Sequence, residues 1–245
     1  MKLSAGGKVV DERHETLPLK HFASGDQLQK KLYTLLERVR QYDENQSELQ
    51  SSHHFMFCLP ISNSKSSKRI LLMGFNPGES DSDWRMTDGK RSEESFDYDF
   101  HQGKPGRSSK RWRSNVDYFI GDAEVFLTEF CFWSSTNVKQ LSERIGSLTI
   151  SNPHLRFCTT INTKLIAALK PNLVVFTGVS RYPLVEEAFK LRPSPEIESP
   201  GGKRLWIHAT SSQCRWLFTR HWTGSFGFTQ ADRELVREEI QKLLQ

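Results

Sequence analysis

The feature that most constrains the fold of this sequence is an apolar run at residues 69–75, which reads Ile-Leu-Leu-Met-Gly-Phe from Ile70 to Phe75. A strand that faces water on one side alternates apolar and polar residues, whereas a strand covered on both faces is apolar throughout. Further apolar runs of strand length follow at residues 124–133, 172–177 and 204–208. The sequence therefore predicts a set of four buried strands.

Helical patterns separate these strands along the chain. Residues 27–42 form an amphipathic pattern, with an apolar stripe made of Leu28, Leu32, Leu35, Leu36 and Val39. Further helices are expected at residues 108–120, 153–169, 178–190 and 230–244. Strands that alternate with helices are typical of a parallel sheet between helical layers. We therefore expect an α/β fold: a three-layer α/β/α sandwich with a central four-stranded parallel sheet.

Length and composition favour one domain. A chain of 245 residues is long enough to bury a sizeable core. We expect residues 1–60 to be an N-terminal extension with a packing helix, and residues 69–245 to be the catalytic core. No apolar run approaches the roughly 18 residues of a membrane span, and residues 1–13 lack the apolar segment of a signal peptide. These features predict a cytoplasmic protein without a membrane partner.

Cysteine spacing argues against a metal centre. The four cysteines lie far apart and form no C-x-x-C pair, at Cys58, Cys131, Cys158 and Cys214. Zinc sites, disulfide frameworks and iron–sulfur clusters need closely spaced or paired cysteines. We expect free, mostly buried thiols and no metal or other cofactor.

Positive charge is concentrated in one segment. The net charge is +5, which is compatible with an anionic partner. Five cations and Trp112 lie within ten residues, and the cations are Lys104, Arg107, Lys110, Arg111 and Arg113. This segment is either a solvated loop or a surface that contacts phosphates.

Polar residues follow the predicted strands where a ligand would bind. The segment 74–78, Gly-Phe-Asn-Pro-Gly, follows the first strand, and Glu129 lies within the second. The segment 208–212, His-Ala-Thr-Ser-Ser, follows the fourth. Because ligands bind at the carboxyl ends of parallel strands, we expect these segments to converge on one edge of the sheet. Taken alone, residues 76–78 are equally an ordinary type II turn, and His208 a lone histidine at the end of a strand.

In this order and spacing, the segments resemble the uracil-DNA glycosylase superfamily. Its single-strand-selective and mismatch-specific branches carry G-x-N-P-G after the first strand, and a second motif of His or Asn followed by Pro-Ser after the fourth. The likeness covers residues 69–244, and the second motif departs from the pattern because Ala209 and Thr210 replace Pro-Ser. The resemblance implies a monofunctional enzyme that flips a nucleotide out of DNA and releases its base by hydrolysis, leaving an abasic site.

The resemblance also assigns roles to particular residues. Asn76 matches the residue that positions the attacking water, and His208 would donate a hydrogen bond to the departing base. The base would contact Gly74, Phe75, Pro77, Gly78, Glu129 and Phe130, with Phe96, Tyr98 or Phe100 stacked on it. The minor groove of DNA would lie against Ser211, Ser212, Gln213 and Arg215. Either Arg215 or Gln213 would fill the space left by the flipped base.

Glu129 bears on which base is removed. In the single-strand-selective branch an Asn reads the uracil edge, and alignment of Phe130 and Cys131 with that pattern puts Glu129 in the reading position. An ionised carboxylate only accepts hydrogen bonds, so it complements the exocyclic amine of cytosine and repels the corresponding oxygen of uracil. Ordinary cytosine is excluded as a substrate, because its excision would destroy the host genome.

The expected substrate is therefore a modified cytosine, hydroxymethylated or glucosylated, in bacteriophage DNA. The superfamily includes a phage-defence glycosylase of this kind, and the long loop at residues 79–106 would leave room for a sugar. Alternatives stay open. One alternative is that Glu129 pairs with a nearby cation and does not read the base. The alternatives for the function are a repair glycosylase for uracil or another deaminated base, a non-catalytic reader of modified DNA, and a nucleoside hydrolase. The sequence indicates no obligate protein partner.

Overall fold

The computed structural model of the chain describes residues 26–52, 54–61, 66–79, 92–94, 107–194, 204–222 and 228–245. For residues 26, 92–94 and 107–113 it describes the backbone alone. The predicted stacking residues Phe96, Tyr98 and Phe100, and the cation Lys104, lie outside the described residues.

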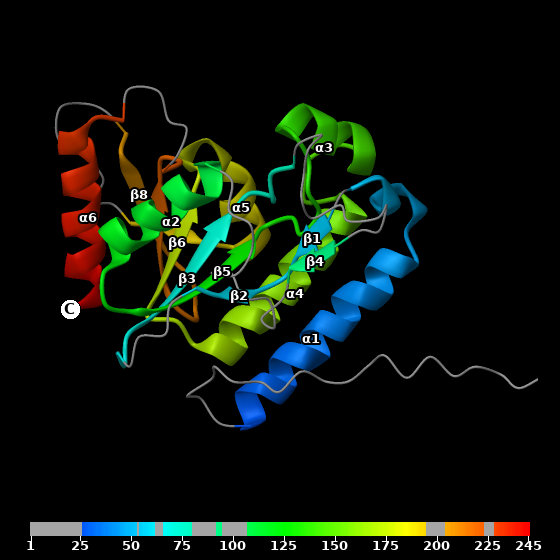
Figure 1. Ribbon diagram of the computed structural model, residues 1–245, viewed down its shortest axis with the longest axis horizontal. Helices are drawn as coiled ribbons and strands as arrows, with labels where there is room; N and C mark the ends of the chain where they lie inside the picture. The colour runs from blue at the N-terminus through cyan, green and yellow to red at the C-terminus, as the bar shows by residue number, and fades with distance from the viewer. Residues whose placement is uncertain are drawn as a thin grey trace, which may run out of the picture.

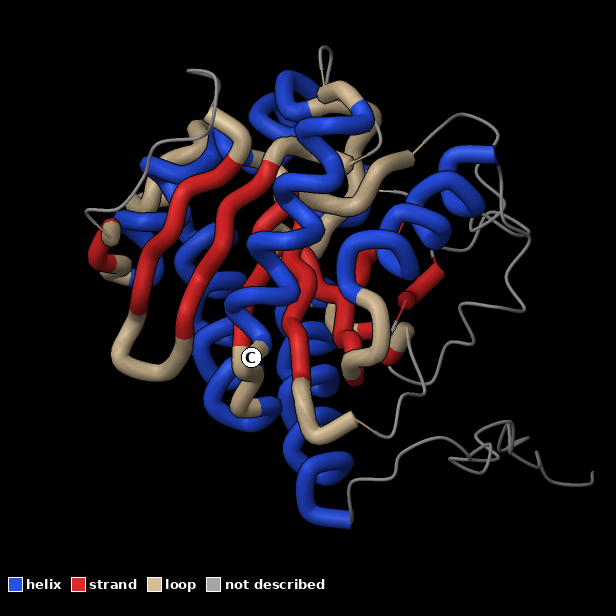
Figure 2. Tube along the Cα trace, turned by 90° about the vertical axis from the view of Figure 1, so that its left-hand side faces the viewer, coloured by secondary structure: helices blue, strands red, loops and turns tan. Residues whose placement is uncertain are grey.

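The centre of the molecule is a seven-stranded sheet in the order β2-β5-β3-β6-β9-β8-β7 (Figures 1 and 2). Four adjacent strands are mutually parallel: β5 (Glu124–Glu129), β3 (Arg69–Gly74), β6 (Leu173–Thr177) and β9 (Arg215–Thr219). The remaining strands are antiparallel to their neighbours: β2 (Leu59–Pro60), β8 (Trp206–Thr210) and β7 (Arg192–Pro193). A separate pair joins β1 (His54–Met56) to β4 (Ser92–Glu94).

The prediction of a parallel fourth strand at residues 204–208 is wrong. This segment belongs to β8, which runs antiparallel to β9, and β9 is the fourth parallel strand. The physical reason is the length of the connection, because only residues 211–214 separate β8 from β9. A turn of that length joins antiparallel strands, whereas parallel strands need a crossover of about a dozen residues or more.

Helices pack on both faces of the sheet (Figure 1). One face of the sheet meets α2 (Arg107–Ile120) and α6 (Gln230–Leu244) in a core that includes Ile70 and Leu72. The other face meets α1 (Asp26–Glu44), α4 (Pro153–Leu169) and α5 (Tyr182–Phe189) in a core that includes Leu71 and Met73. These four residues of β3 are fully buried, which confirms the expectation of a strand covered on both sides.

Local signals fix the ends of the predicted helices. The side chain of Asn152 accepts hydrogen bonds from the first backbone N–H groups of α4, and Lys170 ends that helix in a left-handed conformation. Thr229 and Asp232 form a capping box at the start of α6. Both helices have the predicted bounds, and the apolar stripe of α1 is buried from Leu32 to Val39.

Other elements have weaker sequence signals. They are the helix α3 (Val138–Ile145), the short 3-10 helices η1 (Ser47–Ser51) and η2 (Val179–Arg181), and the strands β1, β2, β4, β7 and β9. All four cysteines are free, and all but Cys214 are buried. Within the described parts of the chain, no helix has both the length and the apolar character needed to cross a membrane.

Candidate active site

The segment that follows β3 runs beside the segment that follows β5. The backbone N–H of Phe130 donates to the carbonyl of Gly74 at 2.9 Å, and that of Cys131 donates to Phe75 at 2.8 Å. Further along, the N–H of Ser135 donates to the carbonyl of Pro77 at 3.0 Å. These hydrogen bonds extend the β3–β5 pairing past the end of the sheet. They hold the Gly-Phe-Asn-Pro-Gly segment as a fixed shelf at the carboxyl edge.

The side chain of Asn76 has a defined orientation on this shelf. Its Nδ2 donates to Oγ of Ser135 at 2.8 Å and to the carbonyl of Pro77 at 2.9 Å. Oγ of Ser135 in turn donates to the carbonyl of Asn137, so it accepts from the amide. The opposite amide orientation would set its oxygen against the carbonyl of Pro77. Both donor hydrogens are thus engaged, and Oδ1 is the atom that can accept a hydrogen bond from a water.

The carboxylate of Glu129 lies against Gly74. The two residues are partners in the β3–β5 ladder, and a Cβ added to Gly74 would lie 2.1 Å from Oε2 of Glu129. Any side chain at residue 74 would therefore displace the carboxylate. The buried Asn162 of α4 holds the end of β5, because its Nδ2 donates to the carbonyl of Glu129 at 2.9 Å. Glu129 and Asn76 thus lie on the same edge of the sheet.

Phe75 packs inward from the shelf. Its ring stacks on Phe130 with centroids 5.8 Å apart, and the guanidinium of Arg181 lies 4.9 Å from its centroid. Phe130 is completely buried, so its side chain supports Phe75, and the expected direct contact between this ring and a base is not available in this conformation. Within the shelf, Pro77 is buried and Gly78 is exposed. Phe75 and Phe130 therefore support the shelf from within, and Gly78 is an exposed residue of it.

A buried ion pair supports the end of the shelf. Oε1 of Glu79 lies 2.6 Å from Nη2 of Arg144, and the Glu79 side chain is 0% exposed. Nη1 of Arg144 also donates to the carbonyl of Ser134 at 2.7 Å, while the hydroxyl of Ser134 donates to Oε2 of Glu79 at 2.6 Å. Arg144 thereby ties the segment after β3 to the segment after β5.

His208 does not lie at this edge, which corrects the expectation that it converges with Asn76. It occupies the middle of β8, opposite Leu217. Its Nε2 lies 3.1 Å from Oε1 of Glu239, so the ring pairs with α6. The cause is again the antiparallel direction of β8, which carries its carboxyl end to the amino edge of the parallel strands.

The predicted DNA-contacting residues after His208 lie at the amino edge as well. Ser211, Ser212 and Gln213 form the turn between β8 and β9, where the N–H of Ser211 donates to the carbonyl of Cys214 at 3.0 Å. Arg215 begins β9 and donates to the carbonyl of Leu243 in α6. These residues are therefore separated from Asn76 by the length of the sheet, and their expected role beside a flipped base is wrong for this geometry.

The carboxyl end of β9 brings a different histidine to the edge. Trp222 anchors this segment, because its ring stacks on Phe119 with centroids 4.5 Å apart and its Nε1 donates to Oγ1 of Thr219 at 3.0 Å. His221 precedes Trp222 and is exposed. Although its surface is exposed, partial desolvation by the surrounding protein lowers the pKa of His221 from its usual value of 6.5, which favours the neutral imidazole.

The predicted basic segment begins α2. Arg107, Lys110, Arg111 and Arg113 fall in the part of α2 whose side chains lie outside the described residues. The backbone direction is informative, because α2 ends at Ile120 just before the amino end of β5. In addition, Asn115 of α2 donates to the carbonyl of Trp222, beyond the carboxyl end of β9, so the first turn of α2 lies toward the carboxyl edge. An N-terminal helix end favours bound anions.

No protein-family model and no curated protein sequence matches this chain. The assignment of a function thus depends on the geometry of the carboxyl edge.

Sequence reasoning missed the histidine that follows β9, His221, and the residues that support this edge, which are Ser135, Arg144, Asn162 and Arg181. Two of them carry a local signal. Asn162 is a lone amide in the buried stripe of α4, a helix without acidic residues. His221 follows Trp216-Leu217-Phe218, an apolar run that the turn-forming residues 211–213 separate from the preceding strand. Together these segments indicate a hairpin.

Proposed function

We propose that this chain is a DNA N-glycosylase of the uracil-DNA glycosylase type, which hydrolytically releases a modified cytosine and leaves an abasic site. The observation that carries the proposal is the position of two side chains at the carboxyl edge of the sheet. Glu129 is the ladder partner of Gly74, and Asn76 follows Gly74 by two residues. The proposed fold assignment is the α/β/α sandwich of that superfamily. Four parallel strands with helices on both faces support it.

Asn76 suits the hydrolytic step. In the proposed reaction the N-glycosidic bond breaks, its electron pair leaves with the base, and a water adds to the sugar carbon and loses a proton. An amide is a weak base, but an oxocarbenium-like transition state needs a well-placed water more than a strong base. The two hydrogen bonds that fix Nδ2 leave Oδ1 in one position to hold that water.

His221 takes the role that the sequence analysis gave to His208, which is to donate a hydrogen bond to the departing base. It lies at the end of the parallel strand β9, so it shares the carboxyl edge with Asn76. A neutral imidazole donates one N–H, which can stabilise the charge that develops on the oxygen of a departing pyrimidine. The start of α2, with its run of cations in the sequence, lies toward the same edge and suits DNA phosphates.

Glu129 supports cytosine as the parent base. Its carboxylate is held against Gly74 and has no hydrogen of its own to donate to a base. The exocyclic amine of cytosine can donate to it, whereas the carbonyl oxygen of uracil would meet negative charge. A modification on the cytosine, such as a hydroxymethyl or glucosyl group, distinguishes the substrate from host DNA.

Base release from defined DNA tests the proposal. Oligonucleotides that contain one cytosine, hydroxymethylcytosine, glucosylated hydroxymethylcytosine or uracil are incubated with the protein, and the released bases are identified by mass. We expect release of a modified cytosine alone, with an abasic site in the strand. Release of uracil alone would establish the repair alternative, and stable binding without base release would establish a non-catalytic reader.

The variant Glu129→Gln tests base selection. Glutamine has nearly the same size as glutamate but also donates hydrogen bonds, so it accommodates the uracil oxygen. We expect the ratio of modified-cytosine release to uracil release to fall by about 5- to 150-fold, which corresponds to a base contact of ~1–3 kcal/mol. Glu239→Gln is the matched control because Glu239 pairs with His208 away from this edge. An unchanged ratio in Glu129→Gln contradicts the reading role.

Ser135 is a positioning residue for Asn76. The variant Ser135→Ala removes the acceptor that holds Nδ2 at 2.8 Å, so the amide samples other orientations. We expect kcat to fall about fivefold with KM nearly unchanged, as the loss of one hydrogen bond of ~1 kcal/mol implies. Ser142→Ala, which removes an exposed hydroxyl of α3, is the control. An equal change in both variants would rule out a specific effect on Asn76.

A further inference from the structure

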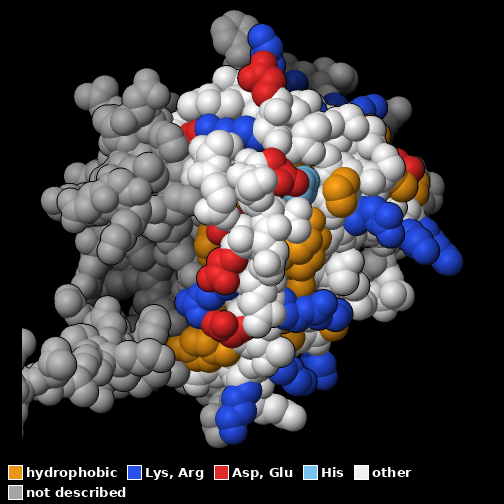
Figure 3. All heavy atoms as spheres, turned by 90° about the vertical axis from the view of Figure 1, so that its right-hand side faces the viewer, with side chains coloured by type: hydrophobic (Ala, Val, Ile, Leu, Met, Phe, Trp, Pro, Cys, Tyr) orange, Lys and Arg blue, Asp and Glu red, His pale blue; other side chains and the backbone are white. Residues whose placement is uncertain are grey.

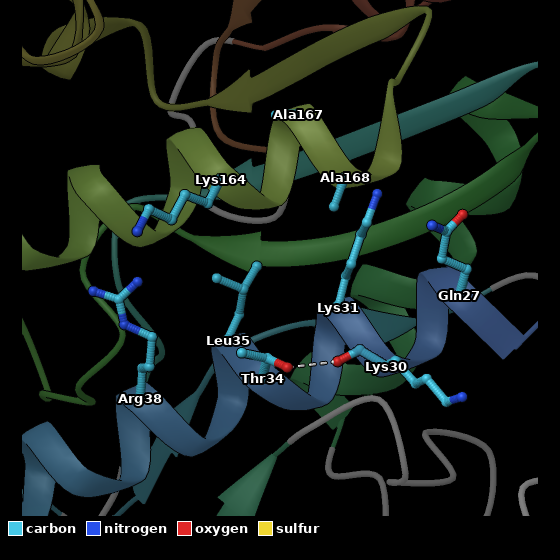
Figure 4. Close-up of a pocket in the computed structure, with 9 residues that line it drawn as sticks. All are labelled: Gln27, Lys30, Lys31, Thr34, Leu35, Arg38, Lys164, Ala167 and Ala168. Carbon is cyan, nitrogen blue, oxygen red and sulfur yellow. Dashed lines mark hydrogen bonds between the residues drawn. The ribbon is translucent and has the colours of Figure 1, made fainter.

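A groove lies between α1 and α4, on the outer side of the molecule (Figure 4). Its volume is about 540 Å³. Its floor is apolar and is formed by Leu35 of α1 with Ala167 and Ala168 of α4. On the side of the molecule that α1 covers, Lys and Arg side chains lie beside apolar surface, with Asp and Glu side chains among them (Figure 3). The groove therefore offers an apolar strip with a charged border.

The border of the groove is positively charged. Lys30, Lys31 and Arg38 come from α1, and Lys164 comes from α4. None of the nine described residues that line the groove is acidic. Figure 4 shows Arg38 and Lys164 reaching from opposite helices at one end, while Lys31 reaches toward Ala168 at the other. Cations thus mark the two ends of an apolar floor.

This groove is separate from the candidate active site. Arg69 at the amino end of β3 donates to the carbonyl of Leu169, so the last turn of α4 lies at the amino edge of the sheet. The groove residues Lys164, Ala167 and Ala168 belong to the last two turns of α4. Gly74, by contrast, ends β3 at the carboxyl edge. A ligand in the groove would leave the Asn76 shelf open.

We propose that this groove binds an acidic amphipathic helix of a partner protein. Lys31 and Arg38 are seven residues apart on α1, which is two helical turns or about 10.5 Å. A partner helix laid along the groove can place carboxylates at positions i and i+7 against these cations. Apolar side chains at i+3 and i+4 would then meet Leu35 and Ala167, which is the pattern of helix-in-groove recognition.

The apolar floor favours a helix over nucleic acid in this place. A DNA strand carries a charge at every nucleotide, and a groove that follows it needs cations along its whole length or aromatic rings for the bases. Here three of the lining residues, Leu35, Ala167 and Ala168, are apolar, and none of the described lining residues is aromatic. The partner that fits is therefore charged at intervals and apolar between them.

A peptide-display selection tests the proposal. The full chain is used to select from a library of 16-residue helical peptides with randomised surface positions. We expect the enriched peptides to share Asp or Glu at i and i+7 with apolar residues at i+3 or i+4. Synthetic peptides from the selection should bind the Arg38→Glu/Lys164→Glu variant at least tenfold more weakly than the unaltered chain, as measured by fluorescence anisotropy.

A second pair of variants controls for net charge. Lys139→Glu/Arg192→Glu makes the same charge change at exposed positions on α3 and β7, and peptide binding should change less than threefold. Circular dichroism shows whether each double variant remains folded. A further variant, Leu35→Gln, alters the apolar floor of the groove without changing the net charge. The proposal is overturned if the enriched peptides lack the pattern, or if they bind both double variants equally. It is also overturned if Arg38→Glu/Lys164→Glu weakens DNA binding and leaves peptide binding unchanged.

Discussion

Replacing Asn76 with alanine is expected to slow base release by about 10²- to 10³-fold, which corresponds to ~2.7–4 kcal/mol of lost transition-state stabilisation. The reason is geometric. Nδ2 is held by Ser135 and by the carbonyl of Pro77, so Oδ1 has one position in which to hold a water. Alanine removes that acceptor and leaves the attacking water without orientation. Single-turnover kinetics on DNA with a modified cytosine measures the effect directly.

Two comparisons separate this role from a structural one. Asn76 is only half-buried, so the alanine variant should keep its affinity for substrate DNA and its thermal unfolding midpoint close to the original values. Asn76→Asp keeps an oxygen acceptor but loses both donor hydrogens, and its rate should fall between those of Asn76→Ala and the unaltered chain. Full activity in Asn76→Ala would exclude Asn76 as the water-positioning residue.

The elements that sequence reasoning predicted best are those with strong local signals. The apolar run of β3, the Asn152 cap of α4 and the capping box of α6 each depend on residues within a few positions of one another. Their bounds follow from hydrogen bonds and burial that are local in the chain. The same holds for the Gly-Phe-Asn-Pro-Gly shelf, whose position after a parallel strand placed Asn76 at the carboxyl edge.

Strand direction was the part that sequence reasoning predicted wrongly. An apolar run such as the one at residues 204–208 has the same pattern in either direction, and only the connection to the next strand decides between them. Residues 211–214 are too few for a crossover, so β8 pairs antiparallel with β9. That reversal placed the carboxyl end of β8 and Arg215 at the amino edge and brought His221 to the carboxyl edge, while the two-residue extension of β8 to Thr210 left His208 in the middle of the strand.

The supports of the site were not predictable because they join distant parts of the chain. Ser135 meets Asn76 across 59 positions of sequence, and Asn162 meets Glu129 across 33. Neither pair follows a helical or strand period, so no local pattern indicates it. The motif identified Asn76, for which we propose a catalytic role, whereas the side chains that orient it depend on how the segments after β3 and β5 come together.

Replacing Arg144 with alanine is expected to lower the free energy of unfolding by about 3–5 kcal/mol, because it leaves a buried carboxylate without its cation. The Glu79 side chain is 0% exposed, and the Arg144 side chain is 12% exposed. Arg144 also donates to the carbonyl of Ser134, so the same change frees the segment that carries Ser135. Urea unfolding followed by circular dichroism measures the loss.

An exposed ion pair provides the matched control for Arg144. Arg40 and Glu37 pair on the surface of α1 with side chains that are 36% and 52% exposed, so Arg40→Ala should lower the free energy of unfolding by less than about 1 kcal/mol. The double variant Glu79→Gln/Arg144→Met removes both charges together and should recover most of the stability lost in Arg144→Ala. If it stays as unstable as Arg144→Ala, the loss arises from packing around Ser134 and not from the uncompensated charge of Glu79. The double variant also lacks the hydrogen bond from Arg144 to Ser134, the residue before Ser135. Because Ser135 orients the amide of Asn76, the rate of base release by this variant shows whether that hydrogen bond is needed for the orientation.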